Sequence, residues 1–270
     1  GLIRKAYDFA KSAHGDQMRH SGDPYYAHPI EVAGILASLH MDVQSVCTAL
    51  LHDVLEDTDT DHAQLTELFG LEIADLVNGV TKLGQLELSN PDATRERKQA
   101  ENFQKFVLAM SRDVRVLMVK LCDRLHNMRT LQFHPKEASR KRIATETLDI
   151  YAPLARRIGV DRICSELEDL SFQHLQPGVF EHISGRLKAW RDAQENAISQ
   201  MSVAIRDLMD QASLKARIYG REKRAYAIWR KLERQNITFE EVADIYAFRI
   251  IVENTATCYQ VLGLLHTHFR

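Results

Sequence analysis

Apolar residues recur at helical spacing through most of the chain. In residues 2–14, Ile3, Ala6, Tyr7 and Ala10 fall on one face, as expected for an amphipathic helix. Similar spacing predicts a helix that begins at His28-Pro29 and further helices at 44–56, 71–83, 97–110, 113–131, 136–157, 160–173 and 177–213. No clear alternation of apolar and polar residues precedes residue 235. The first two thirds of the chain is therefore predicted to be an all-helical bundle.

The pattern changes near residue 200. Residues 247–252 form a clear strand pattern and residues 216–220 suggest a short one, with helices expected at 225–235 and 259–268. Strands that alternate with helices indicate a second, α/β domain. We expect three segments: a helical domain at 1–175, a helical connector at 176–213 and an incomplete α/β domain at 214–270. A polar stretch at 84–97 is expected to be a mobile loop.

Composition narrows the class of protein. Among 270 residues, 45% are hydrophobic and 27% charged, which is typical of a soluble globular chain. The net charge of −2 gives no general attraction to nucleic acids or anionic membranes, and no apolar run is long enough to span a bilayer. The four cysteines form no CxxC pair, which favours reduced thiols in the cytoplasm. We expect a piece of a longer protein, because the chain starts at Gly and stops at Arg.

The stretch 48–58 carries the first candidate chemistry. His52 and Asp53 interrupt an apolar helical stripe. Glu56 lies four residues after His52, and Asp57 lies four residues after Asp53. Residues four apart share a helix face, so one short helix presents an imidazole and three carboxylates. A divalent cation would balance this charge. The alternative is a capped, solvated acidic helix end.

A second acidic residue lies in a buried helix. Asp123 stands within an apolar run, with Asn127 and Thr130 on the same face. A buried carboxylate is costly unless it is paired or bound to a metal. An ion pair with Arg124 or Arg129 is the alternative, but their spacing suits it less well.

The loop near residue 20 carries polar groups of three kinds. Arg19, His20 and Ser21 supply a cation, an imidazole and a hydroxyl, which suit an anionic ligand. The alternative is an ordinary exposed loop. His28 follows before Pro29, at the start of a helix, where a lone histidine is more often packed or capping than ligating.

Basic residues gather in the second domain. Residues 215–234 contain eight lysines and arginines against two acids, and a basic segment after a glycine suits a polyphosphate. A solvated helix face is the alternative. In the first domain, two imidazoles and two carboxylates from three helices could converge on one metal and leave positions open for water and a substrate oxygen. Such a site favours hydrolysis of a phosphoester or pyrophosphate.

The order of these residues resembles the HD superfamily of phosphohydrolases. Longer motifs resemble the RelA/SpoT homologue family, whose members make and destroy the alarmones ppGpp and pppGpp of the stringent response. The motifs are RHSGDPY at 19–25 with HP at 28–29, HDVLEDT at 52–58, VTKL at 80–83, KLCDRLHNMRTL at 120–131, GREKRAYAIWRK at 220–231 and DIYAFRIIV at 244–252.

The resemblance implies a mainly α fold, an HD-domain bundle followed by the beginning of a nucleotidyltransferase-like synthetase domain. It implies a Mn²⁺-dependent hydrolase that removes pyrophosphate from the 3′ position of ppGpp. By position, the manganese ligands would be His28, His52, Asp53 and Asp123. Glu56 and Asp57 would position and activate the attacking water. The nucleotide would contact Arg19, placed on or beside the guanine, and also His20, Ser21, Asn127 and Thr130.

For the second domain, the resemblance implies part of a synthetase site that uses ATP and Mg²⁺. Its residues would be Arg221, Lys223, Lys231 and the Mg²⁺-binding Asp244. Later motifs of that site are missing, so we expect this chain to hydrolyse alarmone without synthesising it. The full-length protein is expected to do both and to carry regulatory C-terminal domains that contact the ribosome.

One departure and two rival interpretations accompany the resemblance. His20 stands where the family often has lysine, so the charge of the nucleotide pocket would depend on pH. The first rival is another HD nucleotide phosphohydrolase, which the Glu56-Asp57 pair and the Arg19 loop disfavour. The second is a hydrolase-silent regulator that binds alarmone; the presence of all four expected metal residues disfavours it.

Overall fold

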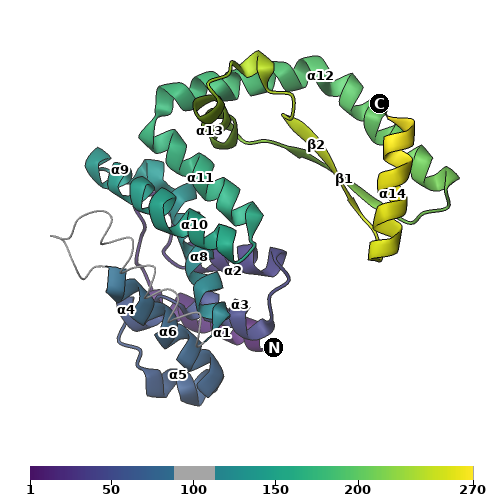
Figure 1. Ribbon diagram of the computed structural model, residues 1–270. Helices are drawn as coiled ribbons and strands as arrows, with labels where there is room; N and C mark the ends of the chain where they lie inside the picture. The colour runs from purple at the N-terminus through teal and green to yellow at the C-terminus, as the bar shows by residue number, and fades with distance from the viewer. Residues whose placement is uncertain (88–112, 270) are drawn as a thin grey trace. The chain divides into compact units, whose positions relative to one another are not determined.

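A computed structural model describes residues 1–87 and 113–269 of the chain. It divides into two compact units, Gly1–Leu175 and Gln176–Arg270 (Figure 1). The described residues are mainly helical with one small sheet, which confirms the predicted fold class. Among them, no helix combines the length and the apolar character needed to cross a bilayer. The predicted helix 97–110 lies outside the described residues, as does most of the predicted loop 84–97.

The first unit consists of helices. They are α1 (Leu2–His14), α2 (Ala27–Ser38), α3 (Val43–Leu51), α4 (Val54–Asp57), α5 (His62–Phe69), α6 (Leu71–Glu87), α8 (Val114–Arg129), α9 (Glu137–Glu146), α10 (Ala152–Arg157) and α11 (Asp161–Leu175). A 3-10 turn (Leu131–Phe133) follows α8, and a π-helical turn (Thr147–Tyr151) joins α9 to α10. Helix α6 continues to Glu87, so the prediction of a loop was wrong for residues 84–87.

Helix α3 lies at the centre of this unit and packs against α1, α2, α6 and α8. Every residue from Ser45 to Leu51 is buried, because the helix has neighbours on all sides. Its N-terminus is capped by Asp42, whose Oδ1 accepts a 2.7 Å hydrogen bond from the Ser45 amide. The core therefore holds the segment before His52 rigidly.

The single helix predicted at 44–56 was wrong in one respect. Helix α3 ends at Leu51 and α4 begins at Val54, so that His52 and Asp53 stand between two helices. His52 Nδ1 donates a 2.8 Å hydrogen bond to the Ala49 carbonyl, and such side-chain bonds compete with the backbone ladder. The break places both side chains at the end of a rigid helix rather than on its flank.

The second unit begins with the 35-residue helix α12 (Pro177–Gln211), the one predicted as a connector. It packs against α13 (Ala225–Gln235), α14 (Thr255–His268) and strand β1 (Arg217–Glu222). A 3-10 turn (Phe239–Glu241) follows α13. Strand β1 pairs antiparallel with β2 (Tyr246–Ile251), Gly220 opposite Phe248 (Figure 1). A Cβ on Gly220 would overlap the Tyr246 hydroxyl, so a larger residue there would require the Tyr246 side chain to move.

Candidate active site

His28 points into a buried cluster rather than capping its helix. It lies in the first turn of α2 with 2% of its surface exposed. Its Nε2 is 3.1 Å from Asp123 Oδ1 and 3.7 Å from Asp53 Oδ2. The structure therefore favours the ligating interpretation over the packed one, and it does so by bringing α2 against α8.

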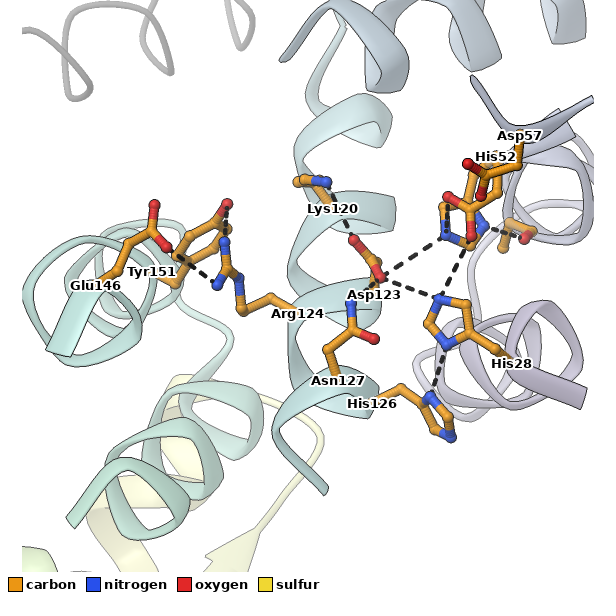
Figure 2. Close-up of polar contacts among 12 residues, drawn as sticks. His28, His52, Asp57, Lys120, Asp123, Arg124, His126, Asn127, Glu146 and Tyr151 are labelled. Carbon is orange, nitrogen blue, oxygen red and sulfur yellow. Dashed lines mark hydrogen bonds and ion pairs between the residues drawn. The ribbon is translucent and has the colours of Figure 1, made fainter. Parts of the chain in front are cut away.

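His52 and Asp53 meet the same cluster from the break between α3 and α4. His52 Nε2 lies 3.1 Å from Asp53 Oδ1 and 3.8 Å from Asp123 Oδ1. One ligand atom each from His28, His52 and Asp53 lies within 4.8 Å of the others. The structure thus brings together all four residues that the sequence suggested as metal ligands, and Figure 2 shows three of them, His28, His52 and Asp123, facing one another. We refer to His28, His52, Asp53 and Asp123 as the four-residue cluster.

The position of the proton on the His52 ring shows whether a cation suits this cluster. Its Nδ1 carries the proton that is donated to Ala49, so a neutral ring has only a lone pair at Nε2. That Nε2 is fully buried and has no hydrogen-bond partner among the described residues. It faces two carboxylate oxygens, and a lone pair facing carboxylates is repulsive unless a positive charge lies between them. Imidazole and carboxylate together suit a divalent metal, so the donor set fits such an ion.

The electrostatics of the cluster point the same way. Burial opposes charge on the His52 imidazole, but the carboxylates of Asp53 and Asp123 outweigh it and raise the His52 pKa to about 9. Burial likewise opposes charge on Asp123, but the Lys120 ammonium and the two imidazoles hold the pKa of Asp123 well below its usual value. The cluster therefore keeps its carboxylate ionised and favours a positive charge beside it, either a second proton on His52 or a metal ion that replaces that proton.

Asp123 is held by its own helix. Lys120 Nζ lies 3.1 Å from Asp123 Oδ2, and Asn127 Nδ2 donates to Oδ1 at 2.6 Å (Figure 2). The predicted alternative partners are engaged elsewhere: Arg124 contacts Glu146 and Tyr151, and Arg129 pairs with Glu166 at 2.6 Å. Asp123 is thus directed at the histidines and kept charged by lysine.

Glu56 and Asp57 stand on α4 beside the cluster. Asp57 Oδ2 accepts a 2.6 Å hydrogen bond from the Tyr25 hydroxyl, which lies 2.9 Å from Asp53 Oδ2. Partial burial raises the pKa of Glu56; the Lys120 charge opposes the rise, and the nearby Asp53 and Asp57 carboxylates add to it. Both acids are exposed, and so they are accessible to water next to the cluster.

A cavity of about 330 Å³ opens beside Asp123. All five residues suggested for nucleotide binding line it, namely Arg19, His20, Ser21, Asn127 and Thr130. Arg19 Nη2 donates to Asn127 Oδ1 at 2.7 Å, which ties the loop to α8. Further lining residues with polar side chains are Lys120, Arg124, His134, Arg142 and Glu146. Most of the charged side chains are cationic, so the cavity suits an anion.

In the second unit, three of the four suggested synthetase residues meet. Lys223 and Lys231 both contact the Asp244 carboxylate, and their hydrogen bonds lower the pKa of Asp244 to about 2. Arg221 lies exposed on β1.

Comparison with known proteins assigns the family. A family model described as "HD domain" matches residues 6–161, and one described as "Region found in RelA / SpoT proteins" matches residues 220–270. The chain belongs to the RelA/SpoT homologue family. The resemblance drawn from its motifs is therefore confirmed.

Several relatives align with nearly all of the chain. A GTP pyrophosphokinase of Myxococcus xanthus is 48% identical over 98% of this chain and 35% of its own length. The guanosine-3′,5′-bis(diphosphate) 3′-pyrophosphohydrolase of Haemophilus influenzae is 45% identical over 97% of this chain and 38% of its own length. The bifunctional (p)ppGpp synthase/hydrolase SpoT of Escherichia coli is 43% identical, with 99% and 38% covered. The chain thus spans little more than a third of these relatives.

Three residues of this RelA/SpoT chain belong to the site although their types and spacing did not single them out. Lys120 could have been found, because it precedes Asp123 by three residues on one helix face. Tyr25 and His126 gave no such signal, since their contacts cross between separate helices. Tyr25 stacks on His14 at 4.5 Å, and burial raises its pKa far above the usual value, with Asp53 and Asp57 adding to the rise, so it stays a donor.

His126 lies behind His28, on the side away from Asp123. The two Nδ1 atoms are 2.7 Å apart (Figure 2). Burial, with the nearby His28 and Arg19 adding to its effect, lowers the pKa of His126 to about 4. Burial also lowers the pKa of His28, although the Asp123 carboxylate opposes this. Two Nδ1 atoms this close share one proton between them.

Proposed function

We propose that the first unit is a Mn²⁺-dependent hydrolase that acts in the cytoplasm. It removes the 3′-pyrophosphate of ppGpp or pppGpp and leaves GDP or GTP. One observation carries the proposal: two buried imidazoles and two carboxylates converge at the wall of a cavity whose charged lining residues are mostly cationic. The names of the relatives from Haemophilus influenzae and Escherichia coli support this choice of substrate.

The metal would be held by the four-residue cluster. A mixed set of imidazoles and carboxylates suits Mn²⁺, which accepts both ligand types. When bound, a divalent cation supplies Lewis acidity toward a phosphoryl oxygen and toward water. The chain contributes a fixed donor set: Ala49 orients His52, while Lys120 and Asn127 orient Asp123.

Glu56 and Asp57 are the proposed water-positioning residues. Their side chains lie on α4, directly after Asp53, and are open to solvent. The raised pKa of Glu56 brings this carboxylate closer to the range in which a general base works well near neutral pH. Asp57 accepts a hydrogen bond from the Tyr25 hydroxyl and is thereby held in one orientation.

Arg19 is the residue best placed to hold the base or a phosphate. Its Nη2 is bound to Asn127, whereas its buried Nη1 has no hydrogen-bond partner among the described residues. A planar guanidinium with an unused donor suits both stacking and hydrogen bonding to a nucleotide. His20, Ser21 and Thr130 line the same cavity, and Lys120, Arg124 and Arg142 add positive charge for the phosphates.

Release of pyrophosphate from ppGpp tests the proposal. We expect release in Mn²⁺, none in chelator, and loss of activity in Asp53→Ala. Arg4→Ala, an exposed change on α1, is the matched control and keeps wild-type activity. Release from unrelated nucleotides but not from ppGpp would show a different HD nucleotide phosphohydrolase. Tight ppGpp binding without release would show a silent regulator.

We further propose that the second unit carries part of a Mg²⁺-dependent synthetase site. The contact of Asp244 with Lys223 and Lys231 supports it, since a carboxylate flanked by two ammonium groups suits a metal-bound polyphosphate. Arg221, on β1, would belong to the same site. We expect no pyrophosphate transfer from ATP to GDP by this chain, and measurable transfer would contradict the proposal. Regulatory domains and ribosome contacts of the full-length protein stay predictions.

A further inference from the structure

The contact between His28 and His126 constrains where protons can lie. Two Nδ1 atoms at 2.7 Å must share one proton, because two protons would collide and two lone pairs would repel. A neutral imidazole has a single N–H. The position of the shared proton therefore decides the state of Nε2 in His28, the atom that faces the four-residue cluster.

Two arrangements are possible. If His126 donates, His28 has its own proton on Nε2, pointing toward Asp123 Oδ1 at 3.1 Å, and it cannot ligate a metal. If His28 donates from Nδ1, its Nε2 presents a lone pair to the cluster. Only the second arrangement matches His52, whose Nδ1 proton goes to Ala49 and whose Nε2 also faces the cluster.

The geometry is suited to a supporting role for His126. Helix α8 supplies both Asp123, on the cluster side of His28, and His126, on the other side, three residues later. The rings of His28 and His126 lie 4.8 Å apart, and His126 is buried. In Figure 2 the rest of the His126 ring points away from the cluster, so His126 is not itself placed as a ligand.

We propose that His126 is a positioning residue that accepts the Nδ1 proton of His28 and so keeps the His28 Nε2 lone pair directed at the metal. This inference rests on the proposed function, because it concerns the same metal centre. Outer partners of ligating histidines fix the tautomer and the ring orientation, and their loss commonly weakens metal binding 10- to 100-fold. His126 would thus set metal affinity without touching metal or substrate.

Mn²⁺ affinity of the whole 270-residue chain is the primary measurement, followed through the electron paramagnetic resonance signal of free Mn²⁺. His126→Asn places an amide oxygen near the position of Nδ1 and keeps an acceptor. His126→Leu removes the acceptor and retains an apolar side chain of similar reach. We expect His126→Leu to weaken Mn²⁺ binding by about 10- to 100-fold. We expect the logarithm of the Mn²⁺ Kd of His126→Asn to lie closer to the wild-type value than to the value of His126→Leu.

Two controls separate positioning from simple packing. Thermal unfolding in chelator measures the structural effect of each variant without metal, and His62→Leu removes a half-exposed histidine that pairs with Asp75 in α6. Long-range ¹H–¹⁵N spectra of the protein loaded with diamagnetic Zn²⁺ report the tautomer directly. We expect the Nδ1–H form of His28 in the wild-type chain.

The outcomes distinguish this inference from the proposed function. Equal Mn²⁺ affinity in wild type and His126→Leu would overturn the inference and leave the metal centre intact. Equal loss in His126→Asn and His126→Leu would also overturn it, since packing rather than hydrogen bonding would then matter. A wild-type His28 in the Nε2–H form in the Zn²⁺-loaded protein would contradict it as well. Failure of wild type to bind Mn²⁺ would overturn the metal centre and the inference together.

Discussion

The hydroxyl of Tyr25 lies between two acidic side chains that have different proposed tasks. It is 2.9 Å from Asp53, a proposed metal ligand, and 2.6 Å from Asp57, a proposed water-positioning residue. A phenol has one proton, so the two carboxylates share a single donor. The stacked contact with His14 holds the ring in place. One side chain thus couples the metal ligand to the acid beside it.

Removal of that hydroxyl is a direct test at this scale. In Tyr25→Phe we expect kcat for ppGpp hydrolysis to fall about 10-fold or more, because Asp53 and Asp57 lose their common donor. KM and thermal stability should change little, since the aromatic ring remains. Tyr26→Phe, which keeps its ring next to Lys11, is the matched control. Unchanged kcat in Tyr25→Phe would contradict the coupling.

Arg19 gives a second prediction about a single residue. In Arg19→Ala we expect KM for ppGpp to rise about 10-fold or more with a smaller change in kcat, because a charge-assisted hydrogen bond contributes roughly 1.5–3 kcal/mol. In Arg19→Lys we expect most of the loss to remain, since an ammonium cannot provide a planar, two-pronged contact. Steady-state kinetics measure both values. A pure kcat effect would place Arg19 in the chemical step instead.

At the scale of elements, Arg115 joins the first turns of three helices. Its guanidinium lies 3.2 Å from Asp42 at the start of α3 and 2.7 Å from Glu72 in α6. It also lies 2.7 Å from Asp113, which caps α8 by accepting from the Arg115 amide at 2.9 Å. Acidic groups at helix N-termini are favourable, and one cation relieves their mutual repulsion. This network fixes the helices that carry His52 and Asp123.

The network predicts a stability that depends on pH. Hydrogen bonds from Arg115 lower the pKa of Asp113. Burial opposes ionisation of Asp42, but the contacts with Ser45 and Arg115 outweigh burial and lower the pKa of Asp42. Folded-state pKa values below the unfolded ones mean that this contribution is complete above about pH 4 and disappears as the pH falls through the lowered values. We expect Arg115→Met to lower the free energy of unfolding by about 1 kcal/mol at pH 7.

The difference between Arg115→Met and wild type should shrink as both carboxylates become protonated at acidic pH. Urea unfolding followed by circular dichroism at several pH values measures it. Arg4→Met breaks an exposed pair with Asp8 on α1 and should have a much smaller effect. A difference that stays constant from pH 7 to pH 3 would show that Arg115 contributes by packing alone.

At the scale of the whole molecule, the proposed metal centre lies entirely within Gly1–Leu175. A ligand that binds only the folded form stabilises the unit that holds it, by about 2.7 kcal/mol at 100 times its Kd. Scanning calorimetry with and without Mn²⁺ should therefore show an upward shift of one transition. Asp53→Asn should abolish the shift, and Asp244→Asn, in the second unit, should retain it. A shift that survives in Asp53→Asn would place the metal elsewhere.

The sequence by itself determined the helical class and the candidate residues, because both depend on short spacings. Helix periodicity extends over neighbouring turns, and the pairs His52–Asp53 and Asp123–Asn127 lie within one or two turns. The sequence could not place the break at His52, because that break depends on how the histidine side chain bonds to Ala49. A pattern of apolar residues is the same in a continuous helix and in two consecutive ones.

Only the tertiary structure decided which side chains support those candidates. The contact of His28 with His126 joins residues 98 positions apart, and Tyr25 reaches Asp53 across 28. Such contacts depend on the packing of α2 against α3 and α8, which is set by the whole hydrophobic core rather than by any local pattern. Spacing along the chain names the residues that carry charge, but the fold determines which of them share a proton.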